Sequence, residues 1–329
     1  MPSLNPHPQP TLNNDDTALL DLYPRLTDDD ATVRLLALIE LAELEDAAHA
    51  NWLIWALSDT SADVRREAAD RLAYWEQPET VQALARALSD PAPAVREAAA
   101  HSLAELKTEA SGRLLLPWID SPDGFVQASV LRAWRELRLP ESEAPARAAL
   151  QSGDAAVRLE AVAVLGWLKS PPALPLIAHI ARADADAAVR KMAAGALGYA
   201  PDDTVLDALR QALRDEDWQV REEAAATLGK LRLLPALDAL IASLADDYWQ
   251  VRQKTARALG RLRQPRAIGP LIEHALGHAV ANLRKEAAVA LGEIGDPAAI
   301  PALQRAAQDA DPDVRKLAKL ALTQIQEGV

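Results

Sequence analysis

The segments "DEDWQVREEAAATLGKL" at residues 215–231 and "DDYWQVRQKTARALGRL" at residues 246–262 are near copies of one another. The first begins at Asp215 and the second at Asp246, and in both of them a tryptophan precedes Gln-Val-Arg. A period of this length is typical of repeat proteins in which each unit is one pair of helices. The two segments therefore indicate that the chain is built from tandem copies of a small helical unit.

The Val-Arg pair within these segments recurs along the whole chain. Val126-Gln127 and Leu283-Arg284 are degenerate copies, and with them the series has ten members. The period is 31, or 32 in two cases, and the members begin at Val33, Val64, Val95, Val126, Val157, Val189, Val220, Val251, Leu283 and Val314. We therefore expect ten units, each of which needs only its neighbours to bury its core.

The residues that follow each valine predict an amphipathic helix. Alanine dominates four residues after the valine, and leucine stands eight residues after it in nine of the ten units, with Trp134 in the other. Offsets 0, 4 and 8 lie on one face of a helix, so these positions form a buried stripe. A glycine follows the leucine in five units, and we expect it to end the helix. These glycines are Gly166, Gly198, Gly229, Gly260 and Gly292.

An aspartate precedes the valine by five residues in seven units. A short carboxylate in a turn before a helix can accept hydrogen bonds from free backbone N–H groups. The arginine of the Val-Arg pair recurs in nine of the ten units, as a structural residue should and a catalytic residue should not. We expect charge-assisted hydrogen bonds from these arginines to the aspartates of neighbouring turns. The aspartates are Asp28, Asp59, Asp90, Asp184, Asp215, Asp246 and Asp309.

A second apolar segment precedes each turn, for example residues 299–307, so each unit reads as helix, turn, helix. The pattern Asp-x-x-Val-Arg-x-x-Ala-x-x-x-Leu-Gly, complete at residues 217–229, resembles the HEAT-type repeat of the phycobilin-lyase class. The resemblance extends over residues 17–329. It implies an all-α fold, a right-handed α-solenoid of about ten two-helix HEAT-like repeats.

Residues 1–16 contain four prolines, and we expect them to be a disordered tail before a single solenoid domain at residues 17–329. They lack the apolar stretch of a secretory signal, and no apolar run in the chain is long enough for a membrane span. The chain has no cysteine, which excludes disulfides and thiolate metal sites. We expect a cytoplasmic protein that does not associate with membranes.

The net charge of −13 arises wholly in residues 1–165, which hold 14 Lys and Arg against 27 Asp and Glu. Residues 166–329 hold 21 of each sign. Because nucleic-acid-binding proteins usually carry a surplus of basic residues, the composition argues against nucleic acid as a partner.

The strongest candidate site is a basic stretch in the eighth unit. Residues 248–272 contain six basic side chains and no acidic one. Among them, Lys254, Arg257 and Arg261 are spaced i, i+3 and i+7, hence on one helix face, which we expect to line the concave groove. Lys230 and Lys285 hold comparable positions in the flanking units.

Aromatic residues border this basic stretch in the sequence. Trp218, Tyr248 and Trp249 lie in turns, and Trp167 and Tyr199 lie near the ends of second helices. A cationic centre with an aromatic border suits an anionic, partly apolar partner, since Trp, Tyr and Arg are enriched where binding energy is concentrated. In the alternative interpretation the arginines are solvated and the turn aromatics shield the joints between repeats.

Other chemistry has little support in the sequence. His274 and His278 have a spacing that metal ligands can adopt, with Glu273 beside them, but His278 falls in a predicted turn. We find no phosphate-binding loop and no nucleophile elbow. The sequence therefore predicts no catalytic residue, no metal site and no cofactor.

Two functional hypotheses follow. The first is a non-catalytic scaffold, adaptor or maturation chaperone that holds a protein partner in its groove. The second comes from the family resemblance, which implies a protein that binds a bilin and attaches it to, or detaches it from, a cysteine of a client protein. In that case the basic cluster would bind propionates. The apolar second helix of the first unit, with Leu35, Leu36 and Ile39, is a further possible contact.

Overall fold

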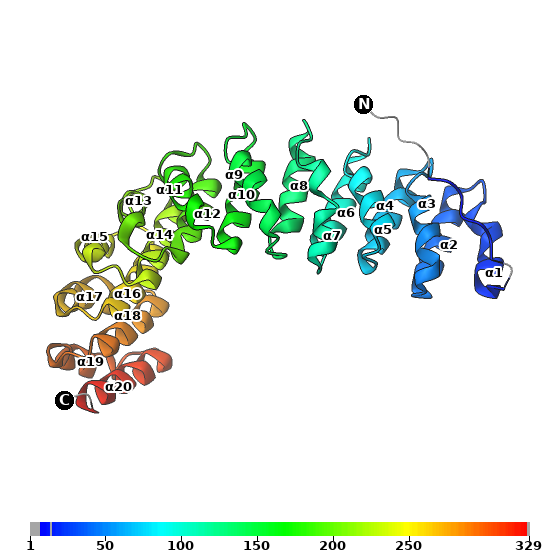
Figure 1. Cartoon of the computed structure of the whole chain (residues 1–329). Coiled ribbons are helices and arrows are strands. Elements are labelled where there is room, and N and C mark those ends of the chain that lie inside the picture. Colours follow the sequence, from blue (N-terminus) through cyan, green and yellow to red (C-terminus); the bar gives the residue numbers. More distant parts are fainter. Residues whose placement is uncertain (1–6, 14, 328–329) are drawn as a thin grey trace. The chain divides into compact units, whose positions relative to one another are not determined.

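The computed structural model describes residues 7–13 and 15–327, and the regular secondary structure of these residues is entirely helical. Ten pairs of helices follow one another along the chain, each pair forming one repeat (Figure 1). The predicted all-α solenoid of two-helix HEAT-like repeats is confirmed.

The first helix of each repeat is short. These first helices are α1 (Thr17–Leu26), α3 (Ala50–Ala56), α5 (Pro78–Ala87), α7 (Glu109–Arg113), α9 (Glu143–Ala149), α11 (Leu174–Ala183), α13 (Leu206–Ala212), α15 (Leu237–Ser243), α17 (Ile268–Leu271) and α19 (Ile300–Ala306). Single 3-10 turns flank many of the helices, at Ala47–His49, Leu72–Tyr74, Leu116–Trp118, Pro140–Ser142, Pro171–Ala173, Leu197–Tyr199, Asp203–Val205, Leu234–Ala236, Pro265–Ala267 and Pro297–Ala299.

The second helices carry the Val-Arg pairs. They are α2 (Ala31–Glu43), α4 (Ala62–Arg71), α6 (Pro93–Ala104), α8 (Gly124–Trp134), α10 (Ala155–Leu168), α12 (Ala187–Ala196), α14 (Trp218–Leu231), α16 (Trp249–Leu262), α18 (Ala281–Ile294) and α20 (Pro312–Glu327). Within a compact unit, second helices pack on one another, as α14, α16, α18 and α20 do in series. We call the surface formed by these helices, on the side away from the first helices, the second-helix face.

The chain divides into two compact units of five repeats each. The N-terminal unit is Met1–Leu168 and ends with α10, and the C-terminal unit is Lys169–Val329 and begins with the repeat that contains α11. A single domain over residues 17–329 and a disordered tail over residues 1–16 stay predictions. Of that tail, residues 1–6 and 14 lie outside the described residues.

The buried stripe lies where the periodicity places it. Val220, Ala224 and Leu228 of α14 are fully buried, and so are Val251 and Leu259 of α16. These side chains face the neighbouring repeats, so each helix pair completes its core only against the next one.

The prediction that glycines end the second helices holds for Gly198, which lies just past α12, and is wrong for the other four, which lie inside their helices. Gly229 lies inside α14, and a Cβ atom there would stand 2.7 Å from both Cα and Cβ of Ala258 in α16. The glycine thus allows two helices to approach closely. The helix ends instead at Arg232, whose φ of 53° is left-handed, and α16 ends in the same way at Arg263.

The predicted links between turns are present. Arg221 donates from Nε and Nη2 to the carboxylate of Asp246 at 2.6 and 3.1 Å, and from Nη1 to the carbonyl oxygen of Asp215 at 2.8 Å. Asp246 also accepts a hydrogen bond from the backbone N–H of Tyr248 at 2.9 Å. We call this arrangement the turn ladder, and it recurs in the pairs Arg34–Asp59, Arg65–Asp90, Arg190–Asp215 and Arg284–Asp309.

The turn ladder is interrupted after the eighth repeat. His278 stands where other turns have aspartate, and its Nδ1 accepts a hydrogen bond from the N–H of Val280 at 3.1 Å. The step from Val251 to Leu283 is one residue longer than the usual period. Directly before this turn the backbone forms a π-helical segment, Ile272–Leu276. Because a π-helix closes hydrogen bonds over five residues instead of four, this segment accommodates the extra residue.

Candidate partner-binding site

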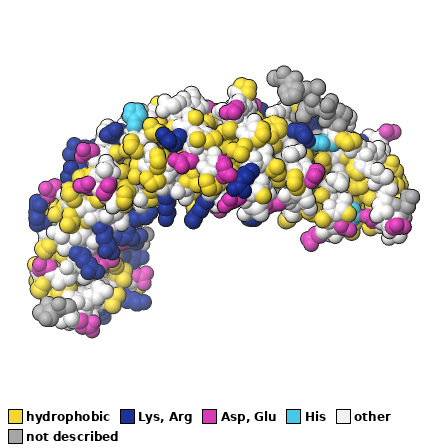
Figure 2. All heavy atoms as spheres, in the orientation of Figure 1, with side chains coloured by type: hydrophobic (Ala, Val, Ile, Leu, Met, Phe, Trp, Pro, Cys, Tyr) yellow, Lys and Arg dark blue, Asp and Glu magenta, His cyan; other side chains and the backbone are white. Residues whose placement is uncertain are grey.

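Three of the predicted cations meet in one groove on the second-helix face of the C-terminal compact unit. The groove has a volume of about 360 Å³ and lies among α16, α18 and α20. We call it the α16–α20 groove, and its lining consists of Arg257, Arg261, Lys285, Glu286, Val289, Glu293 and Leu317. Figure 2 shows lysine and arginine side chains gathered over α16 and α18.

Arg257 forms one fixed wall of the groove. Its Nε and Nη2 each donate to an oxygen of Glu286 in α18 at 2.7 Å. The Glu286 side chain is only 10% exposed, and its hydrogen bonds raise the pKa of Arg257 above the ordinary value. A bidentate pair of this kind holds both side chains in one geometry. Arg257 is therefore neutralised locally and serves to shape the groove.

Arg261 is the cation that the groove leaves available. It is exposed, and it makes no ion pair or hydrogen bond with any residue that the structure describes. Lys285 is less free, because its Nζ lies 3.7 Å from the carboxylate of Asp313. Val289 and Leu317 add apolar surface beside these charges. The groove can thus receive a carboxylate and an aliphatic or aromatic side chain together.

The neighbouring surface on α14 has mixed charge. Lys254 lies 3.9 Å from Glu222, and burial raises the pKa of Glu223 although the charge of Lys191 opposes this shift. Lys230 lies against Gly198, because a Cβ atom on that glycine would stand 3.1 Å from the Lys230 Nζ. Lys254 and Lys230 therefore contact the preceding repeats and do not line the α16–α20 groove.

The turn aromatics form a separate cluster. The rings of Trp218 and Tyr248 stack, with centroids 5.3 Å apart and planes 8° from parallel. The guanidinium of Arg221 lies 5.7 Å from the Tyr248 centroid, so Tyr248 covers the turn ladder while remaining 44% exposed. This contact agrees with the alternative interpretation, in which turn aromatics shield the joints. Trp249, the first residue of α16, is half-buried.

The aromatic cluster and the groove lie toward opposite ends of α16. Trp249 opens the helix and Arg261 stands 12 residues later, which is about 18 Å along the helix axis. A single compact ligand does not reach both ends, whereas an extended segment does. The sequence predicted one patch with a cationic centre and an aromatic border, whereas the structure has Tyr248 directly before α16 and Arg261 in its last turn.

The two remaining aromatic candidates have structural contacts. The Tyr199 hydroxyl donates to the carbonyl oxygen of Ser170 at 2.7 Å, which ties the end of its repeat to the start of the same repeat. Trp167 belongs to the N-terminal compact unit, is 43% exposed, and has the Arg138 guanidinium 5.8 Å from its ring centroid. In the same unit Leu36 of α2, one of the apolar residues named as a possible contact, is 51% exposed, whereas Leu35 and Ile39 are half-buried.

Four residues of the groove were missed by reading the eighth repeat alone. Glu286, Val289 and Glu293 lie on α18, and Leu317 lies on α20. They stand 3, 6 or 10 residues after the first residue of their own Val-Arg or Leu-Arg pair, the same offsets that Lys254, Arg257 and Arg261 have in α16. Reading those offsets across consecutive repeats would have found them.

Within residues 7–13 and 15–327, no group of three or more histidine or acidic side chains is arranged to hold a metal ion. His274 lies in the π-helical segment, 3.9 Å from Glu273, and His278 caps a turn. No helix in the described part of the chain combines the length and the apolar character that crossing a bilayer requires.

Comparison with protein families agrees with this architecture. The family model for HEAT repeats matches residues 50–135, 113–187, 175–253 and 237–323. These matches span most of the chain, so the protein belongs to the HEAT-repeat family. The match is to HEAT repeats in general and does not specify the phycobilin-lyase type. A search of curated proteins found no match.

Solved structures share the fold at low sequence identity. Importin-β of yeast (Kap95p) is 14% identical, with a TM-score of 0.64 over 94% of this chain and 50% of its own. YibA of E. coli is 18% identical, with a TM-score of 0.55 over 91% of this chain and 99% of its own. An engineered protein is 22% identical, with a TM-score of 0.53 over 94% and 99% of the two chains. This chain thus spans about half the length of importin-β.

Proposed function

We propose that this protein is a non-catalytic scaffold, adaptor or maturation chaperone that binds an acidic, partly apolar segment of a protein partner in the α16–α20 groove. The observation that carries the proposal is Arg261, an exposed cation without an ion partner among the described residues, beside the apolar surface of Val289 and Leu317.

The charged and apolar side chains of the groove indicate which kind of partner segment would bind. A glutamate or aspartate of the partner would pair with Arg261, with Lys285 contributing a second positive charge. An adjacent aliphatic or aromatic side chain of the partner would pack on Val289 and Leu317. Leu320, on the same helix as Leu317 and 52% exposed, extends the apolar surface along α20. A segment with acidic and apolar residues fits this lining better than a uniformly charged one.

The fold is consistent with this role. Solenoids present long surfaces on which extended segments bind. The structural neighbour Kap95 has been solved as a complex with Nup1. An extended segment could also reach the exposed Tyr248 at the other end of α16, about 20 Å from Arg261 along the helix axis.

A defined peptide tests the proposal. We would measure the fluorescence anisotropy of a synthetic 12-residue peptide that combines glutamates with leucines and one phenylalanine. The wild-type chain is expected to bind it, and Arg261→Glu is expected to weaken binding at least about tenfold, because a charge-assisted hydrogen bond becomes a repulsion. The matched control is Arg266→Glu, because Arg266 lies outside the groove and pairs with Asp238 at 2.8 Å.

The outcomes separate the hypotheses. Equal weakening by Arg261→Glu and Arg266→Glu would mean that only general charge matters, and the proposed groove would be rejected. Lysate proteins retained by wild type and by Arg266→Glu, but not by Arg261→Glu, would then be sequenced as candidate partners. The bilin-binding alternative predicts visible absorbance that copurifies with the chain and is lost in Arg261→Glu. No geometric feature of the groove favours a planar ligand over a peptide.

A further inference from the structure

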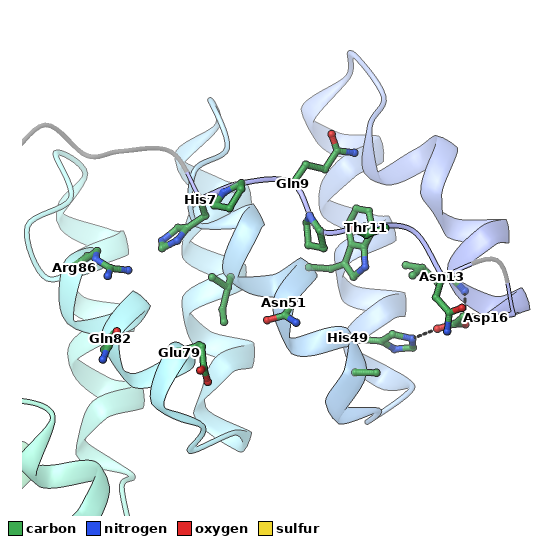
Figure 3. A pocket seen from close by; sticks show the side chains of 16 residues that line it. His7, Gln9, Thr11, Asn13, Asp16, His49, Asn51, Glu79, Gln82 and Arg86 are labelled. Atoms are coloured by element: carbon green, nitrogen blue, oxygen red, sulfur yellow. Dashed lines mark hydrogen bonds and ion pairs between the residues drawn. The ribbon is translucent and has the colours of Figure 1, made fainter.

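The N-terminal residues 7–13, which we call the strap, lie across the first helices of the N-terminal compact unit (Figure 3). The strap has no regular secondary structure. Its backbone N–H at His7 donates to Ser58 Oγ at 2.9 Å, and Gln9 Nε2 donates to the Tyr23 hydroxyl at 3.1 Å. His7, Pro10 and Leu12 are half-buried, whereas the residues between them are exposed.

The sequence of the strap explains its extended backbone. The rings of Pro8 and Pro10 fix φ at about −65°, and both prolines disfavour helical backbone at His7 and Gln9, which precede them. A segment that is already extended loses little conformational entropy when it docks. The strap is therefore a pre-ordered ligand for the surface beneath it.

The surface beneath the strap has the features of a peptide-binding groove. A cavity of about 660 Å³ lies between the strap and α1, α3 and α5. Its aromatic support is the row Tyr23, Trp52 and Trp55, in which each neighbouring pair of rings meets edge to face with centroids 5.7 Å apart. Trp52 is 2% exposed, so it fixes the groove wall from within.

Polar groups in this groove have hydrogen-bonding capacity that the strap does not use. The exposed amides Asn51 and Gln82 line the cavity and make no side-chain hydrogen bond with any described residue. His49 is 3% exposed, with Nε2 2.7 Å from Asp16 Oδ2, while its buried Nδ1 has no hydrogen-bond partner among the described residues. Amide side chains are both donors and acceptors, so they can hydrogen-bond the backbone of an extended peptide.

We propose that α1, α3 and α5 form a second binding site, which takes an extended Pro-x-Pro segment of a protein partner, and that the strap is its resident occupant. Within the described residues, the strap's hydrogen bonds to distant parts of the unit are those of the Gln9 side chain to Tyr23 and of the His7 N–H to Ser58. Asn13 accepts only from Asp15 and Asp16, directly after it, so a competing segment has little to break. The remaining cavity volume and the free amides allow the partner more contacts than the strap makes. The site is independent of the α16–α20 groove, which lies in the other compact unit.

Removal of the strap provides the test. The probe is a fluorescent peptide with the sequence of residues 7–13, HPQPTLN. A chain lacking residues 2–12 is expected to bind the probe at least about tenfold more tightly than the intact chain, where the tethered strap competes at high effective concentration. A peptide with both prolines replaced by alanine is expected to bind more weakly, because it must first be ordered. Circular dichroism would confirm that the shortened chain is folded.

Point variants complement the truncation. Tyr23→Phe removes the hydroxyl that accepts from Gln9 and is expected to weaken the probe's binding to the shortened chain several-fold. Tyr74→Phe, at an exposed tyrosine outside this groove, is the matched control. Pro8→Ala with Pro10→Ala in the intact chain is expected to loosen the strap and let the probe in. Equal binding to intact and shortened chains, or to both peptides, would overturn the proposal. An intact-chain dimer that the truncation abolishes would instead make a second copy the occupant and overturn the assignment to a partner.

Discussion

Residues 215–231 and 246–262 are near copies, yet the arginine that they share has different partners in the two. Arg221 reaches the carboxylate of Asp246 in the next turn. Arg252, at the same position in the second copy, donates from Nε to the main-chain carbonyl oxygen of Asp246 in its own turn. The next turn offers His278 instead of a carboxylate. The repeat that follows therefore decides what a repeated residue does.

On the second-helix face, too, the following repeat decides the role of each residue. The first copy has Ala226 where the second has Arg257, and only Arg257 finds a carboxylate, Glu286, in the repeat after it. Arg261 pairs with no carboxylate of the described residues, although Glu293 lines the same groove, and so it remains available for a partner. In the second copy, therefore, Arg257 belongs to the scaffold and Arg261 to the candidate site.

The largest expected difference between the copies is in the turn ladder. Arg221→Met should lower the free energy of unfolding by about 3–5 kcal/mol, because it leaves the largely buried Asp246 carboxylate without its partner. Arg252→Met should cost only about 1 kcal/mol, the value of one hydrogen bond. Urea unfolding followed by circular dichroism would measure both. Similar losses in the two variants would show that the arginines have equivalent roles.

The glycines that let neighbouring second helices approach should contribute equally to stability in the two copies. Gly229→Ala and Gly260→Ala should each cost about 1–3 kcal/mol, since the new methyl would stand within 3 Å of the next second helix. Gly269→Ala, which meets nothing within 4 Å, should instead stabilise by about 0.5–1 kcal/mol through helix propensity. Melting temperatures of the three variants test this. A neutral Gly229→Ala would show that α14 and α16 can move apart.

Introducing a carboxylate at position 278 should remove the difference between Arg221 and Arg252. His278→Asp places an acceptor at the position that Asp246 holds one repeat earlier, and should stabilise the chain by about 1–2 kcal/mol through Arg252. In that background Arg252→Met should become more costly, which a double-mutant cycle would measure. His274→Asp, in the π-helical segment, is the control and should have little effect. An unchanged stability of His278→Asp would mean that Arg252 cannot turn toward the next repeat.

The smallest expected effect is on the stability of the chain at acid pH. Hydrogen bonds from Arg284 hold the pKa of Asp309 below its ordinary value of 3.8. The stability that this pair contributes is present above that ordinary pKa and is lost as the pH falls through the lower folded-state pKa. Asp309→Asn should therefore give a shallower loss of urea resistance between pH 4 and pH 2 than wild type, and His278→Asp a steeper one. The same loss of urea resistance between pH 4 and pH 2 in wild type and in Asp309→Asn would contradict the assigned role of the pair.

Features set by the spacing of residues could be predicted from the sequence. The period gave the number of repeats, and the offsets 0, 4 and 8 gave the buried stripe that Val220, Ala224 and Leu228 confirm. The arginine–aspartate links followed as well, because a fixed period places one turn over the next. The glycine prediction was wrong for all but Gly198, because a glycine near a helix end can serve either helix termination or close packing, and the sequence does not tell the two apart.

The candidate site was predicted only in part, because pairing across repeats is not local. Arg257 looks like a free cation in residues 248–272, and its partner Glu286 stands 29 residues away on another helix. The strap shows the same limit. Four prolines in residues 1–16 led to the prediction of a disordered tail, and the sequence does not reveal that Gln9 meets Tyr23 or that His7 meets Ser58.

The sequence by itself determined the repeat, its helix pair, its core and its ladder, since each of these depends on distances along the chain that the period keeps constant. Only the tertiary structure decided which charges remain available. That outcome depends on which side chain of the following repeat comes within ion-pair distance of each arginine: Asp246 for Arg221, Glu286 for Arg257, and no carboxylate among the described residues for Arg261, although Glu293 lines the same groove. A carboxylate within hydrogen-bond distance neutralises a guanidinium, and its absence leaves one for a partner.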